Sequence, residues 1–168
     1  MCIRDRSSKR LSLAAIDSAV TVELSFNQHP VAQRSVTSTE RSADWRDRYR
    51  RGLRSNGSNP LGVTARATRL LGPSPLDEQL SEARREIDSA LVEQLPAARA
   101  RLGDLCVRAT SALVASTGGS ALFVEQQAQR LAREALFLLV QGQTPEIKQH
   151  HLQRLTSDSS QQRLDNGD

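Results

Sequence analysis

"REALFLLVQGQTPEIKQHHLQRL", residues 133–155, joins an apolar helical segment to a second, amphipathic segment through a polar break. The apolar segment is predicted to end at Gln141. Thr144 is a residue type that caps helix N-termini, and proline is favoured at the first helical position, where Pro145 stands. The stretch therefore predicts two helices joined by a corner around Gly142. This corner is either a plain helix hairpin or a surface that faces a ligand.

Similar start and stop signals predict further helices at residues 60–71, 75–91, 96–117 and 123–141. Asn59 and Ser74 are candidate N-caps, and Gly72 and Gly118 are candidate stops. In each segment the apolar residues recur at spacings of three and four, which places them on one face of a helix. In the last helix, which begins at residue 145, this face contains Ile147, His151, Leu152 and Leu155.

These helices predict a mainly α fold, an up-and-down four-helix bundle plus a short fifth helix. The segment 123–141 is predicted to be the central helix, because Leu136, Phe137 and Val140 widen its apolar face. We expect part of that face to be covered by another domain or subunit. The fifth helix is predicted to pack across one end of the bundle or to reach a partner.

The N-terminal part has a different pattern. Residues 19–26, "AVTVELSF", alternate apolar and polar side chains, which predicts a short strand. Residues 1–6, "MCIRDR", resemble a translated sequencing-adapter remnant, so we expect residues 1–10 to be an artefact or disordered and the front of the protein to be cut there. Residues 156–168 are polar and are also predicted to be disordered.

Composition restricts partners and cellular setting only weakly. The net charge of +4 is carried mainly by arginine, which permits acidic partners without selecting one. Cys2 and Cys106 are too few for a disulfide framework or a zinc site, and Cys106 falls on an apolar helical face, where we expect it to be buried. No apolar run reaches the roughly 18 residues of a membrane span, and the N-terminus does not resemble a signal peptide. We expect a cytoplasmic protein.

Few residues outside the corner suggest chemistry. His150 and His151 are adjacent, so on a helix they point in different directions; we predict no metal site there and place both at the surface or at a cap. The segment 41–54 is rich in arginine and contains Trp45 and Tyr49. Nucleic-acid binding, a solvated linker or first helical turns, and contact with the phosphates of a nucleotide cofactor all remain open for it. Its aspartates weaken the positive field, and no nucleic acid is the expected outcome.

Three motifs give the chain a resemblance to a known family. Gly118–Gly119 form a glycine pair, "RLAREA" occupies residues 130–135, and "QGQTPEI" occupies residues 141–147. Over about residues 43–155 the sequence resembles the C-terminal helical domain of acyl-CoA dehydrogenases, whose members carry GGxGY, RLYRDA and YEGTSEIQ at these places. The resemblance implies a C-terminal helical bundle at 43–155, and it makes residues 11–42 a remnant of the family's middle β-domain.

The resemblance also implies contacts with flavin adenine dinucleotide (FAD). The matching positions are Gly118, Gly119, Gln143 and Thr144, and Arg54 lies near the family's pyrophosphate-binding arginine. Gly142 stands where the family carries its usual catalytic glutamate. Because glycine cannot remove a proton, no catalytic residue is assigned. This difference indicates a base located elsewhere, a different chemistry, or a subunit that supports an active relative.

The resemblance leads to one main functional prediction. The chain is expected to be a C-terminal fragment of an acyl-CoA dehydrogenase-like flavoprotein oxidoreductase, which acts on acyl-CoA thioesters, carries FAD in the intact parent and forms a homo-oligomer, a dimer or a tetramer. The fragment is expected to be inactive alone. The alternative is a non-catalytic helical-bundle interaction protein, and an arginine-dependent nucleic-acid binder is a third hypothesis.

Overall fold

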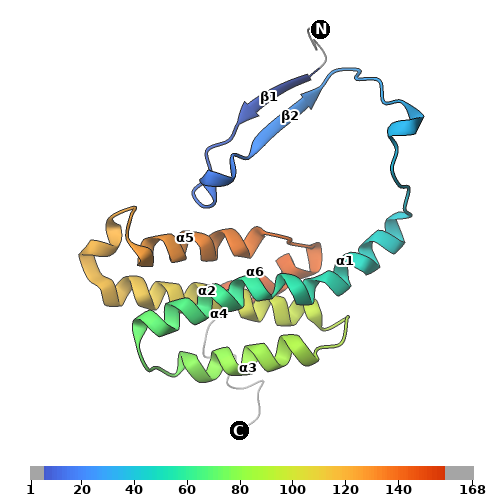
Figure 1. Ribbon diagram of the computed structural model, residues 1–168. Coiled ribbons are helices and arrows are strands. Elements are labelled where there is room, and N and C mark those ends of the chain that lie inside the picture. Colours follow the sequence, from blue (N-terminus) through green and yellow to red (C-terminus); the bar gives the residue numbers. More distant parts are fainter. Residues whose placement is uncertain (1–5, 158–168) are drawn as a thin grey trace. The chain divides into compact units, whose positions relative to one another are not determined.

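The computed structural model describes residues 6–157 (Figure 1). Contacts between residues divide the chain into two compact units, Met1–Arg46 and Asp47–Asp168. Helices dominate the described residues, which confirms the mainly α prediction. The first unit contains a small sheet, and the second contains the helical bundle.

The first unit is built around a two-stranded antiparallel hairpin. In it, β1 (Arg6–Arg10) pairs with β2 (Val22–Phe26) in a register that places Arg6 opposite Phe26. The turns η1 (Asp17–Ala19) and η2 (Gln33–Ser35) are short 3₁₀ helices. The carboxylate of Asp17 accepts hydrogen bonds from the Arg10 guanidinium (3.3 Å) and from the backbone N–H of Leu13 (3.2 Å). These bonds hold the connection between the strands.

This hairpin confirms one sequence prediction and corrects another. The strand predicted within residues 19–26 is present as β2. The disorder predicted for residues 1–10 does not extend to Arg6–Arg10, which form β1; residues 1–5 lie outside the described part of the chain. The segment RSSKR has no apolar alternation that marks a strand, so its conformation depends on pairing with β2.

The helices that form the bundle follow one another as α1 (Ser42–Asn56), α2 (Ser58–Leu71), α3 (Leu76–Ser89), α4 (Leu95–Thr117), η3 (Gly118–Leu122), α5 (Gln127–Val140) and α6 (Pro145–Thr156). Short connections make α2, α3, α4 and α5 neighbours in turn, as predicted for an up-and-down bundle. No helix within residues 6–157 has the length and apolar character needed to cross a membrane.

Local signals account for most of the helix ends. The backbone enters the left-handed region at Gly72 (φ +90°) after α2 and at Gly118 (φ +69°) after α4, where glycine is favoured. At the start of α6, Oγ1 of Thr144 accepts a hydrogen bond from the backbone N–H of Ile147 at 3.3 Å. The stops and the cap predicted at these three places are therefore confirmed.

Three predicted starts are wrong. Asn59 does not cap α2, because this helix begins at Ser58 and Gly57 occupies the N-cap position. Ser74 does not cap α3 with its side chain; instead, its backbone N–H donates to the carboxylate of Asp77 (3.0 Å), inside the first turn. The helix predicted from residue 123 begins at Gln127, because the backbone turns before it. In that turn the N–H of Gln126 donates to the carbonyl of Phe123 at 3.0 Å.

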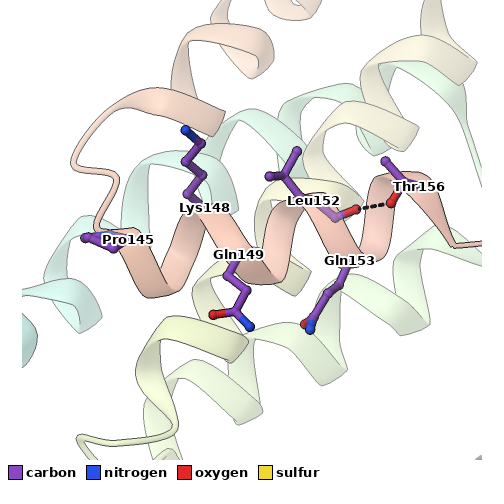
Figure 2. Close-up of a pocket in the computed structure, with 6 residues that line it drawn as sticks. All are labelled: Pro145, Lys148, Gln149, Leu152, Gln153 and Thr156. Atoms are coloured by element: carbon purple, nitrogen blue, oxygen red, sulfur yellow. Dashed lines mark hydrogen bonds between the residues drawn. The ribbon is translucent and has the colours of Figure 1, made fainter.

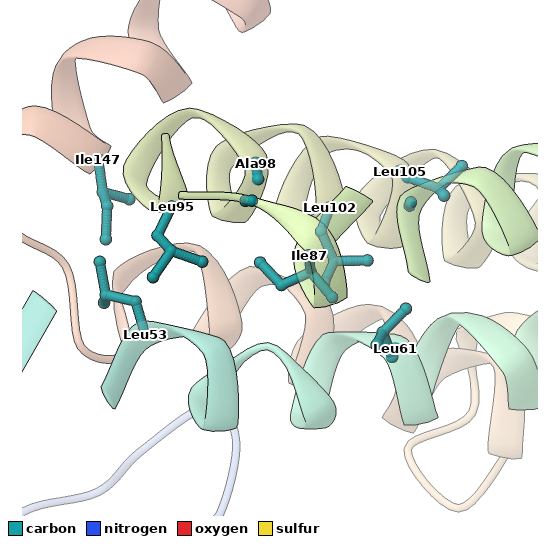
Figure 3. Packing of buried hydrophobic residues seen from close by; sticks show 10 residues of the cluster. Leu53, Leu61, Ile87, Leu95, Ala98, Leu102, Leu105 and Ile147 are labelled. Atoms are coloured by element: carbon teal, nitrogen blue, oxygen red, sulfur yellow. The ribbon is translucent and has the colours of Figure 1, made fainter. Parts of the chain in front are cut away.

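The core is centred on α4, which packs against α2, α3, α5 and α6. At one end, Leu95 and Leu102 of α4 lie with Leu53 of α1 and Ile87 of α3, and all four are almost fully buried (Figure 3). Small residues let neighbouring helices approach α4 on several sides, and these are Ala98, Ala100, Gly103 and Ala109. Buried Cys106 also lies on this helix, as predicted.

The prediction that residues 123–141 form the central helix is wrong. In α5, Leu131, Ala135 and Leu138 are buried, but Leu136 and Val140 are 59% and 62% exposed. The apolar face is thus wider than the surface that α4 and α2 cover. Sequence periodicity alone overestimated the burial of α5, because an apolar residue can lie at the surface of a domain.

The last helix, α6, packs against α4. Ile147 and His151 are buried, whereas Leu152 and Leu155 are about half exposed, at 52% and 49%. The surface position predicted for His151 is therefore wrong. Of the apolar face predicted for this helix, only Ile147 and His151 are buried. Thr156 still belongs to α6, and the rest of the predicted disordered tail from residue 158 onward lies outside the described residues.

Candidate functional site

The corner between α5 and α6 is formed by Gln141–Thr144. The N–H of Gln141 donates to the carbonyl of Phe137 (2.9 Å) and closes α5. Gly142 then adopts φ +66°, a left-handed conformation that favours glycine. Thr144 begins α6, and its carbonyl accepts the N–H of Lys148 at 2.9 Å. The reversal is thus fixed by one glycine and one N-cap.

A face of α1 lies against this corner. A Cβ atom added to Gly142 would stand 2.9 Å from the hydroxyl oxygen of Tyr49 and 3.6 Å from Nδ2 of Asn56. Between these two residues, Leu53 is buried in the same core cluster as Ile147 of α6. The spacing of four and three residues puts all three α1 side chains on one helical face. The many arginines of this segment hide that face in the sequence.

An ion pair joins α1 to the first turn of α6. The Arg50 guanidinium donates to the Glu146 carboxylate at 2.8 Å, across a separation of 96 residues in the chain. The pKa of Glu146 falls to about 2, first because its carboxylate accepts its own backbone N–H at the helix start, and then because Arg50 and Thr144 donate to it. The carboxylate is therefore ionised at neutral pH, with its charge against the positive end of the helix.

Arg54, the residue predicted to lie near a pyrophosphate, contacts the end of α3. Its Nη1 donates to the carbonyl of Ile87 at 2.7 Å and also to that of Asp88, and its Nη2 donates to the carbonyl of Ala90 at 2.7 Å. These carbonyls have no partner within the helix, so the guanidinium satisfies them as a C-terminal cap. These bonds use three of the five N–H donors of the Arg54 guanidinium.

A comparison with known families covers α5, which leads into this corner, but neither α1 nor α6. Residues 63–141 match the family model described as acyl-CoA dehydrogenase, C-terminal domain. This segment, slightly less than half of the chain, is similar to the C-terminal domain of that family. The match runs from α2 to the end of α5 and stops one residue before Gly142. No match is found among curated proteins or among solved structures.

The glycine pair lies inside the region that matches the acyl-CoA dehydrogenase domain. Gly118 and Gly119 follow α4 and are exposed, and a Cβ at either position would meet nothing within 4 Å in the described chain. Exposed apolar residues lie close by in the chain: Leu122 is 79% exposed, and Phe123 is 65% exposed. The backbone here is accessible to another molecule.

The two glycine-bearing segments lie at opposite ends of α5 (Figure 1). A helix of 14 residues is about 21 Å long, so the structure does not bring Gly119 next to Thr144. Among the other predicted acyl-CoA dehydrogenase site residues, Gln143 is exposed, and its Nε2 donates to the carbonyl of Leu139 at 3.2 Å. The predicted cofactor residues therefore form two separate surfaces.

An open groove continues from the corner along α6. Figure 2 shows Lys148 and Leu152 on one side of the helix and Gln149 and Gln153 on the other. The lining is mainly apolar surface from Leu152, Pro145 and the stems of the longer side chains. No set of three His, Cys, Asp or Glu side chains gathers as a metal site in residues 6–157.

Proposed function

We propose that this chain forms the C-terminal helical domain of an acyl-CoA dehydrogenase-like flavoprotein oxidoreductase, which acts on acyl-CoA thioesters in the cytoplasm. The observation that carries the proposal is the family match over residues 63–141, which includes α4, the helix at the centre of the bundle. Bound FAD would supply a hydride acceptor in such an enzyme. This domain would bind and orient the cofactor and would shield it from water.

The corner and the glycine pair are the proposed contact surfaces for FAD. Thr144 is half-buried with its backbone at the bend, and Gln143 is exposed beside it. At the other end of α5, the absence of side chains at Gly118 and Gly119 permits close approach to the backbone. Because about 21 Å separates the ends of α5, the two surfaces would contact distant parts of one flavin, or two flavins in a homo-oligomer.

The corner itself provides no carboxylate base. Gly142 has no side chain, and the hydroxyl of Tyr49 stands over it. Glu146 is nearby in sequence, but its carboxylate is held by Arg50 and by the start of α6. We therefore propose a binding and orienting role for these residues, with any base for the α-proton supplied from another part of the parent protein.

The test is to express the chain together with the coding sequence that precedes it in the source DNA. We expect a yellow protein with about one flavin per subunit, whose flavin is bleached anaerobically by an acyl-CoA. The 168-residue chain purified alone should hold no flavin. An upstream region that encodes no flavin domain, or a flavin protein insensitive to every acyl-CoA, would reject the proposal.

One observation favours the alternative of a non-catalytic interaction protein. Leu136 and Val140 of α5 lie one turn apart and are mostly exposed, as are Leu152 and Leu155 of α6. The measurement is the oligomeric state of the chain by light scattering, with the double change of Leu136 and Val140 to serine. Self-association that this change abolishes, in a chain whose upstream DNA encodes no flavin domain, would support the alternative.

A further inference from the structure

His151 occupies a tightly packed position between α6 and α4. Its side chain is buried, with 4% of the residue exposed. A Cβ atom at Gly103 of α4 would stand only 2.6 Å from Cε1 of His151 and 3.4 Å from Cδ2 of Leu139 on α5. The ring thus fills the space that this glycine leaves, and α6 lies close to the backbone of α4.

The two nitrogen atoms of this ring have no partner on the neighbouring helices. Both Nδ1 and Nε2 of His151 are buried without a hydrogen-bond partner among the described residues. A neutral imidazole carries one donor and one acceptor, and burial without partners is unfavourable for both. The contact between the ring and α4 therefore rests on packing.

The charged groups that face the ring are mostly cationic. Arg99 of α4 is 2% exposed; its Nη2 donates to the carbonyl of Leu138 at 2.9 Å, and its Nη1 has no partner among the described residues. Arg154 and His150 approach from α6 itself. Asp104 of α4 is the acidic neighbour, and it also accepts bonds from Arg108 and Arg154. From α5 the ring meets the apolar side chain of Leu139.

A proton on His151 would therefore be unfavourable in the folded protein. Burial is the largest cause that lowers the pKa of His151 below its ordinary value of 6.5, and Arg99 lowers it further, with Asp104 opposing. The pKa of His151 is lower in the folded chain than in the unfolded chain. The stability that the neutral ring contributes to the folded chain is therefore fully present above about pH 6.5, and it is lost as the pH falls through that value toward the folded pKa.

We propose that His151 makes the docking of α6 onto α4 sensitive to acid, so that protonation of the buried ring releases the helix and the corner at its start. This proposal does not depend on the flavin site. α6 begins at Thr144, so release of this helix would also release the N-cap and the Glu146 ion pair with Arg50. Acidification would then open the corner before it unfolds the rest of the bundle.

The experiment uses the whole chain and follows α6 by amide hydrogen exchange at about pH 7.5 and about pH 5.5, corrected for intrinsic rates. The opening constant of α6 should rise by up to about tenfold per pH unit below 6.5, while exchange in α2 changes less. A proton NMR titration of the His151 ring should give a midpoint below 6.5.

Two variants provide the controls. His151→Leu keeps the packing volume and removes the ring nitrogens, so it should make opening of α6 nearly independent of pH. His150→Gln changes the adjacent, half-buried histidine and should leave the pH response in place. A His151 midpoint at or above 6.5 would overturn the proposal, as would wild-type exchange in α6 that does not change with pH. The ring titration decides the matter even if the leucine variant does not fold.

Discussion

The hydroxyl oxygen of Tyr49 lies 2.9 Å from the point at which the Cβ atom of any larger residue at Gly142 would stand. This relationship joins α1 to the bend between α5 and α6. It leaves little room for a Cβ atom at residue 142. Any side chain at residue 142 would meet both a left-handed backbone (φ +66°) and the Tyr49 ring.

Gly142→Ala is expected to lower the free energy of unfolding by about 1–3 kcal/mol, because both the backbone conformation and the contact with Tyr49 oppose a Cβ atom. Urea unfolding measures the change. Gly142→Glu should lower the free energy of unfolding at least as much, and it should not by itself create dehydrogenase activity. Gly119→Ala is the matched control, since its Cβ would meet open space and should change stability little. Equal losses in both alanine variants would contradict the assignment.

Gly103→Ala tests the packing of α6 on α4. The added methyl group would stand 2.6 Å from Cε1 of His151, so the ring must shift, and we expect a loss of about 1–3 kcal/mol. Gly62→Ala in α2 is the control: its Cβ would meet nothing within 4 Å, and the better helix propensity should add about 0.5–1 kcal/mol. The unfolding temperature should therefore fall in Gly103→Ala and rise in Gly62→Ala. A rise in both variants would show that the His151 ring can shift at little cost.

Arg54→Gln should destabilise the end of α3. It removes a charged donor from the carbonyls of Ile87, Asp88 and Ala90, and hydrogen bonds to charged groups contribute about 1.5–3 kcal/mol. Arg51→Gln changes a neighbouring exposed arginine and should alter stability by no more than about 0.5 kcal/mol. Urea unfolding compares the two. If they behave alike, the C-cap of α3 is not the main role of Arg54.

The ion pair between Arg50 and Glu146 predicts acid sensitivity in a separate pH window. The pKa of Glu146 is about 2 in the folded chain and 4.5 ordinarily. The stability that the ionised carboxylate gives the folded chain is therefore present above about pH 4.5 and is lost between that value and about pH 2. Carbon NMR of the carboxyl group should show the low midpoint. Arg50→Gln should raise that midpoint and Arg46→Gln should not; an unchanged midpoint in Arg50→Gln would contradict the geometry.

Local chemistry made the ends of α2 and α4 and the start of α6 predictable. Gly72 and Gly118 end helices through their left-handed backbone, and Thr144 caps α6 within three residues of its own position. Such signals depend on neighbours along the chain. The strand β1 has no comparable signal, because its polar residues become a strand only by pairing with β2.

Tertiary arrangement was harder to predict for a physical reason. An apolar stripe shows that a helix has a buried face, but not how wide a surface its neighbours provide. For α5 the stripe was wider than its partners, which left Val140 exposed. For α6 the packing placed His151 inward and Leu155 outward, since a glycine on α4 admits the ring.

The candidate site was predictable to the same extent. The bend and its N-cap were evident from Gly142 and Thr144, but the face of α1 that covers the bend was not. Tyr49 and Asn56 become neighbours of Gly142 only through contacts between residues far apart in the chain. Whether Gln143 and Thr144 contact a flavin stays a prediction.

The position of Arg50 along α1 has a mechanical consequence. This helix is continuous from Ser42 to Asn56, and the first unit ends at Arg46, only four residues before the arginine that holds Glu146. A helix rises about 1.5 Å per residue, so the contacts of Arg50, Leu53 and Asn56 are spread over roughly 9 Å of α1. Loss of the pair between Arg50 and Glu146 would therefore leave the contacts of Leu53 and Asn56 to hold α1 against the bend and the core.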